Sequence, residues 1–134
     1  MWDVGVDIVE VERFRRMSYS SHEQFYNRIF TSSEIKYCLS SKDSAQRFAA
    51  TYAGKEAVYK AINRYVKIGL RDIEILRGED GRPKVNLKID EKTMSKLTHD
   101  SKVSIDVKVS LSHIPSYAVA FAMIEIQEAG SREN

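Results

Sequence analysis

One predicted helix constrains this chain more than any other feature. Residues 44–65 are predicted to be helical, with Asp43 as the N-cap. Residues four apart share a helix face. One face of this helix begins aromatic and ends charged: Phe48, Tyr52, Glu56 and Lys60. A carboxylate and an ammonium group therefore stand where the apolar face of a helix ordinarily meets the core.

Small residues cover much of the remaining surface of this helix. They are Ala45, Ala49, Ala50, Ala53, Gly54, Ala57 and Ala61. A small side chain lets another backbone come close. We therefore expect the helix to lie against a sheet or against a partner subunit.

Local patterns predict the other elements of the first half. Residues 3–11 alternate between β-branched and polar side chains, which indicates a strand. Short helices are expected over residues 11–17 and from Phe25 to Phe30. Thr31 and Glu34 have the spacing of a capping box, which predicts the start of a further helix.

The second half is predicted to consist mainly of strands. Residues 71–76 and 84–89 are expected to form a hairpin in which Gly81 supplies a positive φ. Alternation over residues 103–111 predicts another strand, and the apolar residues 117–126 fit a buried central strand.

Together these elements predict an α+β fold. We expect one compact domain over residues 1–134, in which an antiparallel sheet packs against the long helix. The first strand is expected to join that sheet. The polar tail, residues 127–134, is expected to be frayed.

Composition and charge exclude several classes of protein. Hydrophobic residues make up 43% of the 134 residues and charged residues 30%, which argues against disorder. A net charge of +2 is too small to indicate nucleic-acid binding. There is no apolar run of membrane-spanning length, no signal-peptide pattern, and only one cysteine, Cys38. We therefore expect a cytoplasmic protein that binds neither nucleic acid nor membrane.

Arginines crowd one early segment of the chain. They are Arg13, Arg15 and Arg16, with Arg28 farther along. Such a cluster is most often a solvated face, and the residues alone favour that interpretation. The alternative is a docking surface for an acidic partner.

Asp7 and Glu56 are the residues best suited to chemistry. Asp7 interrupts an apolar strand, so it either marks a solvent-facing edge, which is the favoured interpretation, or is a ligand held on a rigid element. Two carboxylates from a strand and a helix can share Mg²⁺, which keeps its other positions for water and phosphate. The alternative for Glu56 is an ordinary stabilising helix pair with Lys60.

Several catalytic motifs are absent from the sequence. There is no Gly-x-Ser-x-Gly elbow and no Gly-rich phosphate loop of the Walker or dinucleotide type. A phosphate would therefore be held by a metal, by basic side chains and by turn amides. The candidates are Lys55, Lys60, Arg82 and the turn at Ser112 and His113.

Six motifs occur in order along almost the whole chain. They are Val4 to Glu10 with Arg13-Phe14, Arg28 to Glu34, Arg47 to Ala50 running into Lys55 to Ala61, Asp72 to Ile75, Gly81-Arg82-Pro83, and Ser110 to His113 ending in Tyr117 to Ala120. Together they resemble the signatures of the holo-acyl-carrier-protein synthases, a family of phosphopantetheinyl transferases.

The resemblance implies an activity and an assembly. Enzymes of this family transfer phosphopantetheine from coenzyme A to a serine of apo acyl carrier protein and release adenosine bisphosphate. By the resemblance, Asp7 and Glu56 bind Mg²⁺, Glu56 helps to deprotonate the serine, and Lys60 contacts the phosphates. The family is typically a homotrimer with active sites between subunits.

The resemblance also implies two sets of binding residues. Coenzyme A is expected to contact Arg47, Lys55, Lys60, Arg82, Pro83, Ser112 and His113. The acidic carrier protein is expected to dock on Arg13, Arg15, Arg16 and Arg28.

Three places depart from the family's pattern. Thr51 stands where a basic residue is common, and Gly54 stands where alanine is usual. The stretch 62–69 has no glycine before Gly69, so we expect the long helix to run on there. This stretch motivates one alternative, a non-catalytic module that binds coenzyme A or a carrier protein. A structural oligomer or nucleic-acid binder that uses the arginines is the third hypothesis.

Overall fold

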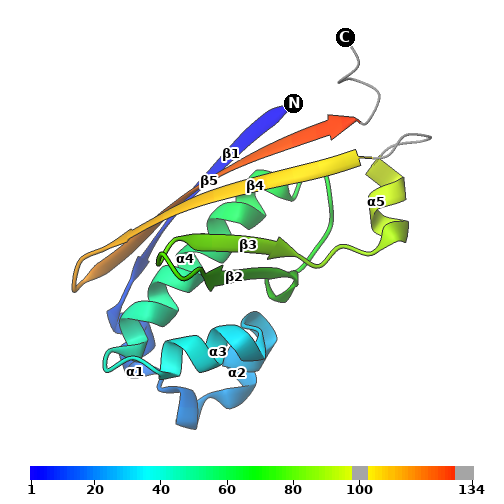
Figure 1. Ribbon diagram of the computed structural model, residues 1–134. Coiled ribbons are helices and arrows are strands. Elements are labelled where there is room, and N and C mark those ends of the chain that lie inside the picture. Colours follow the sequence, from blue (N-terminus) through cyan, green and yellow to red (C-terminus); the bar gives the residue numbers. More distant parts are fainter. Residues whose placement is uncertain (98–102, 129–134) are drawn as a thin grey trace.

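The computed structural model describes residues 1–97 and 103–128. Its elements in chain order are β1 (Trp2–Glu10), α1 (Glu12–Arg16), η1 (Tyr19–Ser21), α2 (Glu23–Ile29), α3 (Ser32–Leu39), α4 (Ser44–Ile62), η2 (Leu70–Asp72), β2 (Ile73–Arg77), β3 (Pro83–Leu87), α5 (Glu91–Leu97), β4 (Val103–His113) and β5 (Tyr117–Glu128). Helices α1, α2 and α3 gather at one end of α4 (Figure 1). The expected α+β fold is confirmed.

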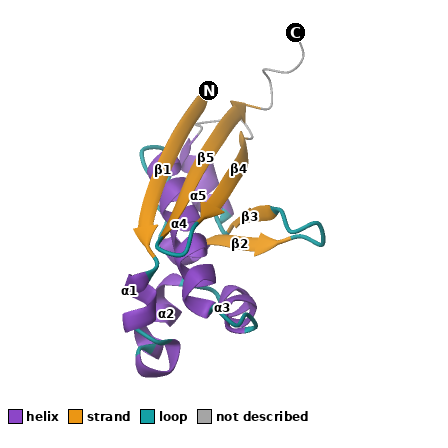
Figure 2. Cartoon of the chain, turned by 90° about the vertical axis from the view of Figure 1, so that its left-hand side faces the viewer, coloured by secondary structure: helices purple, strands orange, loops and turns teal. Residues whose placement is uncertain are grey.

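The strands form two antiparallel sheets. β5 lies between β1 and β4 in a three-stranded sheet, and β2 pairs with β3 in a hairpin. Gly81 at the hairpin turn has φ of 80°, as its position in the turn requires. The three long strands form one layer and α4 lies behind it (Figure 2).

Helix α4 approaches the sheet closely because both surfaces carry small residues. A Cβ added at Gly5 of β1 would lie 2.0 Å from the carbonyl oxygen of Ala57 on α4. β5 contributes three buried alanines to this contact, Ala118, Ala120 and Ala122. The expectation that the small-residue helix lies against a sheet is therefore confirmed.

Aromatic rings fill the core around the first turns of α4. Phe48 is buried, and its ring centroid lies 4.6 Å from that of Tyr26 and 5.1 Å from that of Phe30. Phe14 of α1 reaches the next turn of α4, with its ring 5.6 Å from that of Tyr52. These contacts fix the rotation of α4, and with it the direction of the charged residues one and two turns farther on.

A buried polar cluster joins α3, α4 and β2. The Lys55 amino group donates to Glu34 Oε1 at 2.7 Å and to the Ile73 carbonyl at 2.5 Å. Glu34 Oε2 accepts from the Ile75 amide at 2.8 Å, and Glu34 closes the expected capping box with Thr31. Burial lowers the pKa of Lys55, and the charge of Glu34 opposes that shift.

Gly54 has a packing role beside this cluster. A Cβ added there would lie 2.6 Å from Ile75 Cδ1 and 3.0 Å from Leu111 Cδ2. Glycine at this position therefore makes room for two apolar side chains that reach α4 from the strands.

Helix α4 ends earlier than the sequence predicts. Its last residue is Ile62, and residues 63–65 form a turn. Asn63 is a weak helix former, and Val66 packs with Ile62 and Ile124 in a small buried cluster. The expectation that the helix runs on through this stretch is therefore wrong.

The expected buried strand is central but is covered on one side only. Apolar side chains on the other side of β5 are exposed and pair directly across the strands with exposed side chains of β1. The pairs are Val4 with Met123, Val6 with Phe121 and Ile8 with Val119. These six residues are called the open sheet face below. Exposure reaches 65% at Ile8 and 47% at Phe121.

One further expectation concerns the C-terminal tail. Residues 127 and 128 of the predicted frayed tail belong to β5, and the rest of that tail, 129–134, lies outside the described residues.

In the described ranges no helix has both the length and the apolar character needed to cross a membrane.

Candidate functional site

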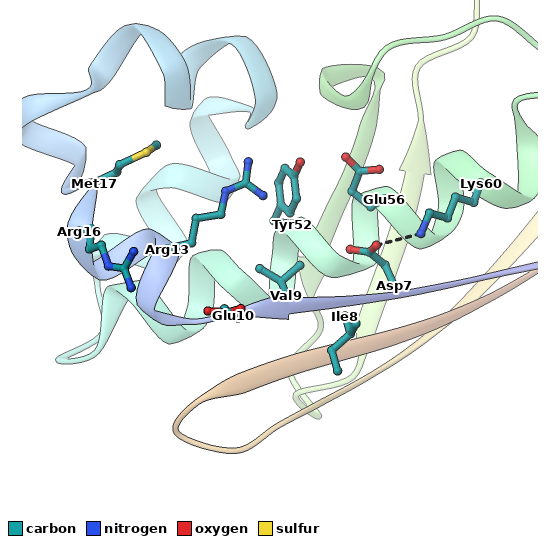
Figure 3. Close-up of a pocket in the computed structure, with 10 residues that line it drawn as sticks. All are labelled: Asp7, Ile8, Val9, Glu10, Arg13, Arg16, Met17, Tyr52, Glu56 and Lys60. Atoms are coloured by element: carbon teal, nitrogen blue, oxygen red, sulfur yellow. Dashed lines mark hydrogen bonds and ion pairs between the residues drawn. The ribbon is translucent and has the colours of Figure 1, made fainter.

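A pocket of about 760 Å³ lies between β1, α1 and α4. Ten residues line it: Asp7, Ile8, Val9, Glu10, Arg13, Arg16, Met17, Tyr52, Glu56 and Lys60 (Figure 3). The charged end of the α4 stripe therefore borders an open pocket.

The pleat of β1 turns Asp7 toward this pocket. Successive side chains of a strand alternate between its faces. Asp7 shares the α4-facing side with Gly5 and Val9, which are both buried. Its own side chain is only 15% exposed. The favoured interpretation of Asp7 as a solvent-facing residue is therefore wrong.

Lys60 connects α4 to β1 at the pocket. Its amino group lies 3.0 Å from Asp7 Oδ1 and donates to the Val6 carbonyl at 3.1 Å. The expected alternative, an ion pair between Glu56 and Lys60, is not among the ion pairs of the described residues. Glu56 instead points into the pocket beside Asp7 and Lys60 (Figure 3).

The donor set in this pocket is small. Among the described residues, no group of three or more histidine, cysteine, aspartate or glutamate side chains could hold a metal. Three carboxylates line the pocket; those of Asp7 and Glu56 lie near each other, and that of Glu10 lies apart from them (Figure 3). The pair of Asp7 and Glu56 fits Mg²⁺, which commonly takes one or two carboxylates with water and substrate phosphate.

Tyr52 fills the space between Glu56 and α1. The guanidinium carbon of Arg13 lies 5.1 Å from the centroid of the Tyr52 ring. Burial raises the pKa of the Tyr52 hydroxyl, and the Glu56 carboxylate one helical turn away raises it further. The phenol therefore keeps its proton at neutral pH.

The four predicted docking arginines do not form one patch. Arg13 and Arg16 line the pocket. Arg15 is held by Asp43 through two bonds of 3.0 Å, which lower the pKa of that carboxyl. Arg28 lines a separate pocket of about 540 Å³ beside α2.

The predicted coenzyme-binding residues are also dispersed within the chain. Only Lys60 lines the pocket, while Arg82 and Pro83 line a groove between β3 and β4. Ser112 and His113 are exposed at the end of β4. The structure does not bring these strand residues to Asp7 and Glu56 within one chain.

Arg47 and Lys55 have structural partners. Arg47 donates to the Tyr37 carbonyl and to Ser40 Oγ at the end of α3. Lys55 is 0% exposed and bonded to Glu34, so its amino group does not face the pocket. Coenzyme contacts of both residues remain predictions without support from their positions here.

Sequence reasoning did not select several lining residues as site residues. They are Ile8, Val9, Glu10, Met17 and Tyr52. Tyr52 carried the clearest signal, because it precedes Glu56 by one helical turn on the same stripe. Met17 lies just after α1 and carried no signal of its own.

Known proteins match the chain over most of its length. Residues 3–122 match the 4'-phosphopantetheinyl transferase superfamily. The chain is 36% identical over 125 residues to the holo-[acyl-carrier-protein] synthase of Chlorobaculum parvum, which covers 92% of this chain and 97% of that protein. It is 39% identical over 124 residues to the corresponding synthase of Clostridium botulinum, covering 92% and 96%.

Solved structures have the same fold. An ACPS–CoA complex of Chronobacterium ammoniagenes superposes with a TM-score of 0.74 at 25% identity and covers 95% of this chain and 98% of that one. The Helicobacter pylori holo-[acyl-carrier-protein] synthase in complex with coenzyme A gives a TM-score of 0.72 at 25% identity, covering 91% and 99%.

Proposed function

The chain belongs to the 4'-phosphopantetheinyl transferase superfamily, and we propose that it is a holo-acyl-carrier-protein synthase. It transfers the phosphopantetheine of coenzyme A to a serine of an apo acyl carrier protein. One observation carries the proposal above the others. Asp7 of β1 and Glu56 of α4 line the same pocket, together with Lys60.

The reaction needs a proton acceptor and charge neutralisation. The serine oxygen forms a bond to the phosphorus that carries the pantetheine, and the bond from that phosphorus to the leaving adenosine bisphosphate breaks. Glu56 is a suitable acceptor for the serine proton because it faces the pocket without an ion-pair partner among the described residues. Lys60 brings a positive charge to the same pocket for the phosphates.

We propose Asp7 and Glu56 as the ligands of Mg²⁺ in this enzyme. When bound, Mg²⁺ would neutralise charge on the coenzyme diphosphate. Asp7 is held in place by Lys60 at 3.0 Å. A carboxylate on a strand and one on a helix packed tightly against it provide a rigid pair.

We further propose a homotrimer with active sites between subunits. The open sheet face supports association, because a contiguous apolar patch of this kind marks an interaction surface. A neighbouring subunit can also supply what one chain lacks at the pocket, namely Arg82, Pro83, Ser112 and His113.

Phe121→Lys is expected to give monomers with little transferase activity, as measured by ultracentrifugation and by the transfer assay.

The carrier protein is proposed to be acidic and to dock beside α1. Arg13 and Arg16 support this, since both line the pocket that holds Glu56. Arg15 is committed to Asp43 and is expected to contribute less. The location is proposed to be the cytoplasm, because the one cysteine, Cys38, is a free thiol.

Mass spectrometry of the carrier protein tests the proposed function. Incubation of the protein with apo carrier, coenzyme A and Mg²⁺ should add the mass of phosphopantetheine to the carrier. Glu56→Gln should fold normally and give no mass gain. The alternative, a non-catalytic binding module, predicts coenzyme binding that does not depend on Mg²⁺ and no mass gain with the wild-type protein.

A further inference from the structure

We propose that Tyr52 is a positioning residue, whose hydroxyl group holds the Glu56 carboxylate and whose ring is held by Arg13 of α1. This inference rests on the proposed function, in which Glu56 is both a metal ligand and a proton acceptor. It adds a residue that acts through Glu56 rather than on the substrate.

Local geometry puts the two side chains together. Tyr52 lies one helical turn before Glu56 on α4, so the two residues share a face. Both line the pocket, and the phenol ring stands between the Arg13 guanidinium and the Glu56 carboxylate (Figure 3). Among the residues that the structure describes, Tyr52 is the one tyrosine that lines this pocket.

The ring of Tyr52 is fixed by its surroundings. On the α1 side, the guanidinium carbon of Arg13 lies 5.1 Å from the ring centroid. Phe14 and Phe30 flank the ring with centroid separations of 5.6 Å and 6.5 Å. A cation is attracted to the face of an aromatic ring, so these contacts hold the Tyr52 ring in place.

The two proposed metal ligands depend on different partners. Asp7 forms an ion pair with Lys60, with 3.0 Å between Asp7 Oδ1 and Lys60 Nζ. Glu56 takes part in no ion pair among the described residues, and the Tyr52 side chain stands beside it (Figure 3). We expect the Tyr52 hydroxyl to bond to Glu56 when the substrates are bound, because active-site hydrogen bonds often tighten only then.

In the proposed hydrogen bond the phenol O–H of Tyr52 donates and the Glu56 carboxylate accepts, because a carboxylate has no proton to donate. An outer partner that orients a ligating carboxylate typically changes metal affinity or activity by about 10–100-fold when it is removed. Tyr52 is placed to have that effect on Glu56.

Arg13 gives this arrangement a connection to the carrier protein. It takes part in no ion pair among the described residues, and it contacts Tyr52 instead. The arginine proposed to receive the acidic carrier therefore touches the side chain that orients Glu56. The contact between Arg13 and Tyr52 therefore connects the proposed docking site of the carrier to the residue that orients Glu56.

The test compares two variants that each lose one phenol hydroxyl. Tyr52→Phe keeps the ring and its contact with Arg13 and removes only the hydroxyl. Tyr65→Phe is the matched control, since Tyr65 also donates to a carboxylate, Asp3 Oδ2 at 2.8 Å, but does not line the pocket. Equal melting temperatures of Tyr52→Phe and the wild type would show that the fold is intact.

Magnesium affinity is the first measurement. MgCl₂ is titrated by calorimetry into each protein in the presence of coenzyme A. The dissociation constant of Tyr52→Phe should rise about tenfold, and that of Tyr65→Phe should stay within about twofold of the wild type. An affinity of Tyr52→Phe within about twofold of the wild type overturns the proposal, as does an equal loss in Tyr65→Phe.

Transfer kinetics are the second measurement. At a fixed magnesium concentration near the wild-type dissociation constant, kcat of Tyr52→Phe should fall severalfold while KM for the carrier stays unchanged. A change confined to carrier KM would make Tyr52 a docking residue and would overturn its positioning role. If the wild-type protein transfers no phosphopantetheine, the proposed function fails, while the magnesium titration still tests the contact between Tyr52 and Glu56.

Discussion

Replacing Gly5 with alanine should separate β1 from α4, and with them the two carboxylates of the pocket. The added Cβ would lie 2.0 Å from the Ala57 carbonyl oxygen and 3.0 Å from the Ala61 amide nitrogen. Both atoms belong to backbone, so no side chain can rotate away. Overpacking of a core costs about 1–3 kcal/mol, and a clash between two backbones belongs at the upper end of that range.

A loss of about 3 kcal/mol corresponds to a fall in melting temperature of about 10 °C for a chain of this size. Transferase activity should also fall at a temperature where the variant is still folded, because Asp7 lies only two residues after Gly5 on β1. Differential scanning calorimetry and the carrier mass assay measure the two effects separately.

Gly69→Ala is the matched control for this prediction. Its added Cβ would have Asp72 Oδ2 as its nearest neighbour, at 3.6 Å, which is an ordinary contact. The backbone there has φ of −91°, which alanine adopts readily. The free energy of unfolding should change by less than about 1 kcal/mol. The reasoning is refuted if Gly5→Ala melts within about 3 °C of the wild type or if both variants lose the same stability.

Three further predictions concern buried ionisable groups. Lys55→Met leaves the Glu34 carboxylate buried without its cation and should cost about 3–5 kcal/mol in urea unfolding; a loss below about 1 kcal/mol would contradict the assigned pairing. Burial raises the pKa of the Cys38 thiol to about 12, so iodoacetamide at about pH 8 should modify it only in unfolded protein; rapid labelling of folded protein would show an accessible thiol. The hydrogen bond from Thr31 lowers the pKa of Glu74 below its ordinary value of 4.5. This group therefore stabilises the fold above that pH and loses its contribution as the pH falls through the lowered native pKa. Glu74→Gln should make the acid loss of stability shallower, and an unchanged slope would contradict this.

Sequence patterns correctly predicted those features of the fold that depend on interactions between residues close together in the chain. The capping box of Thr31 and Glu34 formed as its spacing requires, and Asp43 caps α4 through the Gln46 amide. Gly81 takes the positive φ of the hairpin turn. Each of these depends on a few neighbouring residues, which a sequence displays directly.

The face of β1 that meets α4 could not be predicted in this way. The more apolar side, with Val4, Val6 and Ile8, is the exposed one. The side that packs on α4 uses Gly5 because the backbones come too close for larger side chains. The usual rule places the apolar side of a strand against the core. In β1 the apolar side is exposed, so that rule assigned Asp7 to the wrong side.

The burial of Lys55 was equally hidden in the sequence. Its partner Glu34 comes from another helix, and its second acceptor is the Ile73 carbonyl of β2. A lysine is seldom fully buried unless it is paired, and only the tertiary structure identifies the pair. By contrast, Asp7 and Glu56 were predicted to meet through family resemblance, and they line one pocket.

Crystals of the protein grown with coenzyme A and Mn²⁺ in place of Mg²⁺ would test the central claim most directly. The anomalous signal of manganese should give a peak within about 2.0–2.3 Å of one carboxylate oxygen of Asp7 and one of Glu56, with diphosphate oxygens completing the site. A peak that touches neither carboxylate, or coenzyme A bound without any metal at this pocket, would contradict the account.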